Sequence, residues 1–223
     1  KYISLSHWID ELSPTYANQG GFKRESLSSI KKGRTANSEF WKFNNHIGTH
    51  IDYPKHFNDS GKSSSDFIDS FFIFKKIGLI FFDKTPEPNQ SIDYKLLKNK
   101  LENLNNDVEI IILKTGFEKF RNSKTYWNNN PSFDCDIPLN LKKRFSNLKV
   151  FGFDTISLTS INDREMGKKA HLEFLKKDPT VLIIEDMRLS LLEKSYFPLE
   201  LYIFPLMIKD GDGSPVNCSL KIK

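Results

Sequence analysis

The sequence of 223 residues has little of what marks several protein classes. Its two cysteines, Cys135 and Cys218, cannot form a disulfide framework, so a reducing compartment is the simpler expectation. No apolar run approaches the roughly 18 residues of a membrane-spanning helix. The net charge of +5 comes from lysines spread over the whole chain, without the clustered basic stripe that nucleic-acid binding needs. These absences leave a soluble globular protein, with no membrane or nucleic-acid partner expected.

Cytoplasmic localisation is the corresponding expectation. The chain starts at Lys1 instead of a methionine, which leaves room for a removed signal peptide.

Histidine is also scarce, but its distribution is uneven. Three of the five histidines lie within eleven residues, from His46 to His56, and Asp52 lies among them. Imidazole and carboxylate groups are the usual nitrogen and oxygen ligands of divalent transition metals. Ordinary histidines of a strand and a turn are the alternative, and the density of the cluster makes it the weaker interpretation.

Residue spacing restricts the shape of this stretch. In a straight strand, His46 and Asp52 would lie about 20 Å apart at roughly 3.3 Å per residue, too far to share one ion. A helix is disfavoured by Gly48, by the β-branched residues and by Pro54. We therefore predict a kinked strand or tight loop, bent at Gly48, that folds the first two histidines and Asp52 around one metal ion. Pro54 stiffens the next turn and directs His56 to the same place.

The stretch His46 to Phe57, HIGTHIDYPKHF, resembles the signature HxGTHxDxPxHF of the cyclase family of metal-dependent hydrolases, which includes bacterial kynurenine formamidase and isatin hydrolase. Every fixed position of the signature is matched. The expected metal ligands are His46, His50 and Asp52, and the expected proton shuttle is His56. The expected cofactor is a divalent metal, zinc or manganese, with one or two ions per chain.

The second part of the expected site lies later in the chain. An apolar strand ends in Glu185, and a buried carboxylate is costly unless it is paired or metal-bound, so this residue is a ligand candidate. The family pattern places a histidine ligand on a helix and a glutamate ligand on the next strand end, which correspond to His171 and Glu185. With Asp52 they would hold a second ion. Two positions depart from the family pattern, Thr159 in place of aspartate and Asp186 in place of asparagine.

The alternation of strands and helices is typical of an α/β protein. The resemblance implies a swivelling-domain-like fold, in which a mixed sheet curls toward a barrel with helices packed outside, and we expect one domain over residues 1–223. Strands are expected at residues 2–5, 38–44, 108–113, 149–153, 181–185, 201–208 and 216–222, and in two pieces within 67–82. Helices are expected at residues 93–104, 139–145 and 162–177. The sequence DGDGSP at 210–215 is interpreted as a turn and not as a calcium site.

Together these features predict a metal-dependent hydrolase of a carbon–nitrogen bond in a small aromatic amide, formamide or cyclic amide, such as N-formylkynurenine or isatin. Metal-activated water would attack the carbonyl and His56 would shuttle the proton. Trp8 and Phe22 are candidates for lining the substrate pocket. The alternatives are a cyclase or dehydratase of natural-product metabolism and a non-catalytic metal-site binding protein, the latter suggested by Thr159 and Asp186. The resemblance also implies a homodimer.

Overall fold

A computed structural model describes residues 1–67, 69–176 and 178–223. Its main feature is one mixed sheet, made of the strands β1 (Tyr2–Ser4), β4 (His50–Asp52), β5 (Ile73–Phe74), β6 (Ile77–Phe81), β8 (Ile110–Lys114), β10 (Val150–Phe153), β11 (Leu182–Glu185), β12 (Pro198–Pro205) and β13 (Gly213–Ile222). The order across the sheet is β5-β12-β13-β4-β11-β10-β8-β6, and β1 pairs with β13. The strands that carry the histidine stretch and Glu185 are therefore neighbours in its middle.

The sheet curls into a nearly closed barrel. Strands β6, β8, β10 and β11 run parallel, whereas β4, β12 and β13 pair antiparallel with their neighbours. Strand β6 is the last strand in this order, and β12 is the second. The two strands nevertheless lie near each other. This architecture confirms the mixed, barrel-like α/β fold expected from the resemblance.

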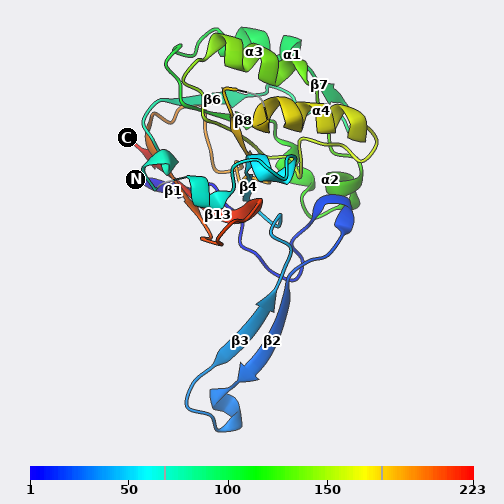
Figure 1. The fold of residues 1–223 in the computed structure, drawn as a ribbon, viewed down its shortest axis with the longest axis vertical. Helices are drawn as coiled ribbons and strands as arrows, with labels where there is room; N and C mark the ends of the chain where they lie inside the picture. Colours follow the sequence, from blue (N-terminus) through cyan, green and yellow to red (C-terminus); the bar gives the residue numbers. More distant parts are fainter. Residues whose placement is uncertain (68, 177) are drawn as a thin grey trace.

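The helices lie on the outside of the sheet (Figure 1). They are α1 (Tyr94–Leu101), α2 (Lys124–Asn128), α3 (Asp136–Arg144) and α4 (Arg164–Leu175). The apolar strand β8 is buried along almost its whole length, as expected for a parallel strand covered on both faces. The side chain of Asp163 caps the start of α4 by accepting a hydrogen bond from the backbone N–H of Met166. None of the described helices is long and apolar enough to cross a membrane.

A hairpin of β2 (Lys23–Ser28) and β3 (Ser38–Lys42) projects away from the sheet (Figure 1). Strand β3 falls within the predicted range 38–44, but β2 was not predicted. Its sequence KRESLS has no buried face, so the apolar alternation that signals a half-buried strand is missing. A short parallel pair, β7 (Ser91–Ile92) with β9 (Ser132–Phe133), lies apart from the main sheet.

The other predicted elements are present with shifted ends. Helix α3 begins at Asp136, three residues before the predicted start, and Pro138 lies in its first turn, where a missing N–H breaks no helical hydrogen bond. The two predicted pieces within 67–82 correspond to β5 and β6. Ile68 of that range and Lys177 at the end of the predicted helix 162–177 lie outside the described residues.

Candidate metal centre

The histidine stretch is bent as its sequence predicts. Gly48 has a φ of +62°, in the left-handed region that favours glycine, and the chain enters β4 two residues later. After β4, residues Pro54–His56 form one turn of 3₁₀ helix, with Pro54 buried in its first position. The bend and the turn together bring His56 back beside the residues that precede β4.

Strand pairing adds the glutamate. In the antiparallel pair of β4 and β11, Glu185 lies directly opposite His50, so their side chains share one face of the sheet. The Nε2 atom of His50 lies 3.4 Å from Glu185 Oε2 and 3.6 Å from Asp52 Oδ1. All three side chains are buried.

Helix α4 supplies the fourth residue of this group, His171. Its Nε2 atom lies 3.4 Å from Glu185 Oε1 and 3.7 Å from Asp52 Oδ2. The ring is fixed from behind, because its Nδ1 atom lies 2.8 Å from the carbonyl oxygen of Gly167 one helical turn earlier. His50 is fixed in the same way, with Nδ1 2.8 Å from the carbonyl oxygen of Gly48. Such backbone contacts leave each Nε2 free to face the carboxylates, as in metal-ligating histidines.

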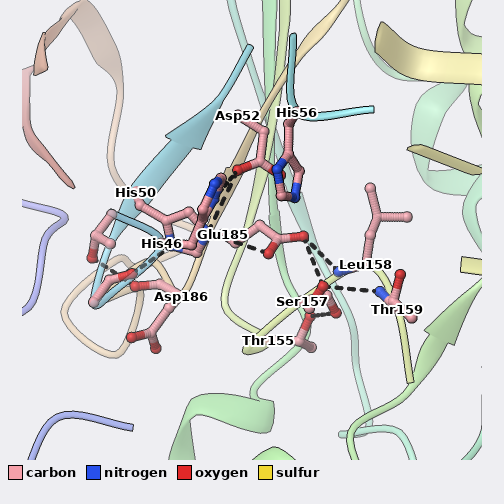
Figure 2. Close-up of polar contacts among 12 residues, drawn as sticks. His46, His50, Asp52, His56, Thr155, Ser157, Leu158, Thr159, Glu185 and Asp186 are labelled. Atoms are coloured by element: carbon pink, nitrogen blue, oxygen red, sulfur yellow. Dashed lines mark hydrogen bonds and ion pairs between the residues drawn. The ribbon is translucent and has the colours of Figure 1, made fainter. Parts of the chain in front are cut away.

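The rings of His46 and His56 lie against each other beside Asp52, with their centroids 4.0 Å apart. The Nδ1 atom of His46 lies 2.8 Å from Asp52 Oδ1. Its Nε2 atom lies 3.1 Å from Asp212 Oδ2, and the same oxygen lies 3.0 Å from Nδ1 of His56. Figure 2 shows His46, His50, Asp52, His56 and Glu185 gathered at one place.

Asp212 is the site residue that sequence reasoning missed. It was assigned to the turn before β13, and turn chemistry explains its sequence context. In the structure the next residue must be glycine, because a side chain on Gly213 would collide with the His46 ring, but the sequence gives no sign of this contact. Strand β13 pairs with β4 so that Gly213 lies opposite Asp52, and this pairing brings Asp212 to the histidines.

Electrostatics in this cluster are dominated by its carboxylates, the buried Asp52 and the partly exposed Asp212. Burial lowers the pKa of His46, but Asp52 and Asp212 outweigh it and raise that pKa to about 10. Burial raises the pKa of Asp52, yet the neighbouring histidines, His46 first, hold it below its usual range. The hydrogen bond from His46, and then the one from His56, lower the pKa of Asp212 as well, so both carboxylates carry their charge at neutral pH.

The donor set fits a divalent metal ion. Ligand atoms of His46, Asp52 and His56 lie within 4.8 Å of one another, as do those of His50, Asp52 and Glu185. The Oδ2 atom of Asp52 is buried and has no hydrogen-bond partner among the described residues. A buried charged oxygen without a partner is costly, and a bound cation would satisfy it. Because Asp52 belongs to both groups, these residues would suffice to hold one ion or two.

Glu185 is held by the loop after β10. Its Oε1 atom accepts hydrogen bonds from the Ser157 hydroxyl at 3.1 Å and from the Leu158 backbone N–H at 2.7 Å (Figure 2). Thr159, which replaces the family's aspartate, lies with its hydroxyl 3.2 Å from Nδ1 of His171. Thr159 departs from the family pattern, but its side chain still contacts the ligand candidate His171.

Asp186 points away from the donor cluster, although it follows Glu185 directly. It accepts three hydrogen bonds from the Arg121 guanidinium, at 2.7, 2.9 and 3.1 Å, and one from the Tyr126 hydroxyl at 2.5 Å. Asp186 is the second departure from the family pattern, and Arg121 neutralises its buried charge.

Trp8 and Phe22 do not join the cluster. Trp8 is 86% exposed, and both residues line a separate cavity between the N-terminal segment, the base of the hairpin and β12–β13. The cavity at the donor cluster contains neither of them. The structure thus separates these two residues from the six ligand and shuttle candidates, which it brings together.

Comparison with known proteins agrees with this geometry. The model of the Cyclase family ("Putative cyclase") matches residues 3–160. The chain belongs to the Cyclase family.

Relatives of this Cyclase-family chain match it over nearly its whole length. It is 26% identical to the kynurenine formamidase of Bacillus anthracis, over 98% of this chain and 99% of that protein. Its structure is similar to an isatin hydrolase bound to the product analogue thioisatinate, with a TM-score of 0.81, 14% identity, and coverage of 100% of this chain and 93% of that one. It is also similar to a potential metal-dependent hydrolase with cyclase activity, with a TM-score of 0.76, 19% identity, and coverage of 99% and 96%. At these identities the structural likenesses show the fold.

Proposed function

We propose that this protein is a metal-dependent hydrolase of a carbon–nitrogen bond in a small aromatic amide, formamide or cyclic amide. The observation that carries the proposal is the convergence of six metal-binding or proton-transferring side chains: His46, His50, His56, His171 and Glu185 line one cavity, and the buried Asp52 contacts three of these histidines. Family membership supports it, as do the activities named for the kynurenine formamidase and isatin hydrolase relatives.

The residues divide into holders of the ion and a proton carrier. His46, His50, Asp52, His171 and Glu185 would hold one or two divalent ions: His50 forms a compact donor group with Asp52 and Glu185, His171 faces the same two carboxylates, and His46 contacts Asp52. When bound, such an ion supplies Lewis acidity that polarises the substrate carbonyl and makes water more acidic. The contacts from Gly48, Gly167, Ser157 and Leu158 keep these ligands oriented, which metal affinity depends on.

His56 is placed to carry the proton. Its Nδ1 atom is engaged by Asp212, so Nε2 is the nitrogen left for the reacting atoms, and the side chain lines the cavity. Burial lowers the pKa of His56, with Asp52 and Asp212 partly opposing this. At neutral pH the imidazole is therefore the neutral base that a proton acceptor must be.

The reaction balances with one proton carried through His56. Water adds to the amide carbonyl carbon while His56 accepts a proton from it. The C–N bond then breaks, and His56 returns the proton to the leaving nitrogen. The products are a carboxylic acid, formic acid for a formamide, and an amine; a cyclic amide gives one ring-opened molecule that carries both groups.

The experiment is an assay of the metal-reconstituted protein on N-formylkynurenine and on isatin, with the variant His56→Ala beside the parent. We expect turnover of one of them by the parent, and a fall in kcat of about 10²- to 10⁴-fold in the variant with its metal content unchanged. Full activity of His56→Ala would remove His56 from the mechanism. Products without net addition of water would favour the cyclase or dehydratase alternative.

We also propose that the protein is a homodimer. The projecting hairpin supports this, because Leu27, Phe40 and Trp41 on it are exposed apolar side chains. Light scattering at micromolar concentration should give twice the chain mass, and a monomer would contradict the proposal.

A further inference from the structure

Two of the ligand candidates belong to different elements but contact the same loop. The loop consists of Ser157, Leu158 and Thr159, which follow β10 (Figure 2). Its first two residues donate hydrogen bonds to Glu185 of β11, and the hydroxyl of its third residue lies beside Nδ1 of His171 on α4. The relative position of Glu185 and His171 is therefore tied to one segment of three residues.

Hydrogen bonds within the loop support its contact with Glu185. The backbone N–H of Thr159 donates to the Ser157 hydroxyl oxygen at 3.1 Å, and this hydroxyl donates its one proton to Glu185 Oε1. The backbone N–H of Leu158 donates to the same carboxylate oxygen at 2.7 Å. A displacement of the loop would thus weaken both hydrogen bonds to Glu185 together.

The loop also contacts the side of the His171 ring that faces away from the carboxylates. The carbonyl oxygen of Gly167 lies 2.8 Å from Nδ1, and since a carbonyl oxygen can only accept, Nδ1 carries a proton. The Thr159 hydroxyl oxygen, 3.2 Å from Nδ1, shares this proton as a second acceptor. The Nε2 atom is left to face Asp52 and Glu185. Helix α4 packs directly on the loop, because a side chain at Gly167 would collide with Thr159.

A buried asparagine holds this loop from outside the site. Asn130 lies between α2 and β9 and has no exposed surface. Its Nδ2 atom lies 3.2 Å from the carbonyl oxygen of Ser157 and 3.0 Å from that of Thr159, the two residues that flank Leu158. The carbonyl oxygen of Pro131 lies 3.1 Å from the same nitrogen. All three neighbours can only accept, so the amide must direct its NH₂ group toward the loop.

The other half of this amide contributes no protein contact. The Oδ1 atom of Asn130 is buried and has no hydrogen-bond partner within residues 1–67, 69–176 and 178–223. A buried amide oxygen without a partner is destabilising. The contribution of this side chain is therefore the set of hydrogen bonds that its NH₂ group donates.

We propose that Asn130 is a positioning residue for the metal centre. By holding two carbonyl groups of the loop, it fixes the Ser157 and Leu158 donors that orient Glu185 and the Thr159 hydroxyl that supports the His171 ring. Contacts behind the ligands raise metal affinity, because ligands that are already oriented need not be ordered when the ion binds. The inference rests on the metal centre of the proposed function, but its test needs no turnover.

The test is a titration of the metal-free protein with cobalt(II), whose visible absorption reports the geometry of its ligands. In Asn130→Ala we expect the dissociation constant for cobalt(II) to rise by about tenfold, as for outer partners of metal ligands, and the absorption bands to change. The matched control is Asn128→Ala, an exposed asparagine two residues earlier, which should match the parent. Leu97→Ala removes a buried side chain of α1 and controls for lost stability. It should lower the urea midpoint but leave cobalt binding and absorption of the folded protein unchanged.

Variants of the loop keep the test decisive if Asn130→Ala does not fold. Ser157→Ala removes a contact with Glu185, and Thr159→Val removes the hydroxyl beside His171. Each should weaken cobalt binding, because Asn130 acts only through these contacts.

Cobalt affinity and absorption equal to those of the parent, in Asn130→Ala or in both loop variants, would overturn the inference. A parent that binds cobalt but hydrolyses no amide would contradict the hydrolase proposal alone. A parent that binds no cobalt would contradict both proposals.

Discussion

Glu185 and Asp186 are adjacent buried carboxylates with opposite surroundings. Asp186 is 1% exposed and is neutralised by Arg121 of the same chain, with the Tyr126 hydroxyl as a further donor. Glu185 is also buried, but no arginine or lysine among the described residues is paired with it, and the imidazoles of His50 and His171 lie 3.4 Å from its oxygens. We infer that the Arg121–Asp186 pair is structural, because the protein neutralises that buried charge itself. The carboxylate of Glu185 contacts histidines, so its surroundings suit a bound metal cation.

Replacing Glu185 by glutamine should produce the largest effect. Glutamine keeps the oxygen that accepts from Ser157 and Leu158 but removes the charge. We expect loss of the ion assigned to this residue and a fall in kcat/KM of about 10³-fold or more, as for loss of a metal that polarises the substrate. The metal-free unfolding free energy should change by less than about 1 kcal/mol. Metal analysis, kinetics and urea unfolding in chelator would check this, and normal metal content with normal activity would contradict it.

Replacing Arg121 by methionine should give the opposite result. Asp186 would then be a buried charge without its cation, which costs about 3 kcal/mol. Urea unfolding should show this loss, while activity of the folded variant at low temperature should fall much less than in Glu185→Gln. An unfolding free energy equal to that of the parent would show that the Arg121–Asp186 pair is not structural.

Replacing Asp212 by asparagine should have an intermediate effect. Asp212 contacts one ring nitrogen of His46 and one of His56, so the change loosens a ligand and the proton carrier without removing either. Outer partners of this kind are typically worth about 10- to 100-fold in activity or metal affinity. Asp59→Asn, in an exposed turn, is the matched control. If kcat and KM of Asp212→Asn stayed within twofold of the parent values, Asp212 would have a role only in the turn before β13.

The smallest effect is expected from replacing His7, which lies near the Arg121–Asp186 pair. Burial lowers its pKa to about 4, with Asp186 opposing this and Arg121 adding to it. The unfolded chain, with a histidine pKa near 6.5, therefore binds more protons between those two values, and stability falls as the pH drops from about 6.5 to 4. His7→Gln should show a smaller drop in urea midpoint between pH 7 and pH 4.5 than the parent. An identical drop in both proteins would contradict the assignment to His7.

The bend of the histidine stretch could be predicted from sequence because Gly48 and Pro54 restrict the backbone locally. Glu185 could be predicted because a carboxylate at the end of an apolar strand needs a partner. Both signals reside in a few consecutive residues. The fold itself was expected from the resemblance more than from the strand and helix pattern.

Other features depend on pairing between distant segments or on exposed surfaces. Asp212 reaches His46 only because β13 pairs with β4, about 160 residues earlier in the chain. Strand β2 is exposed on both faces, so no hydrophobic pattern reveals it. Asn130 looks like one more polar residue of an asparagine-rich loop until the fold places its amide against the segment that contacts Glu185.

The most direct test of the metal centre is elemental analysis of the protein purified without added metal or chelator, compared with His50→Ala. Our account predicts one or two equivalents of a divalent transition metal in the parent and their loss from the variant, because His50 belongs to the buried donor set. A parent that binds no metal even after reconstitution would contradict the hydrolase mechanism and leave a non-catalytic binding protein as the better explanation.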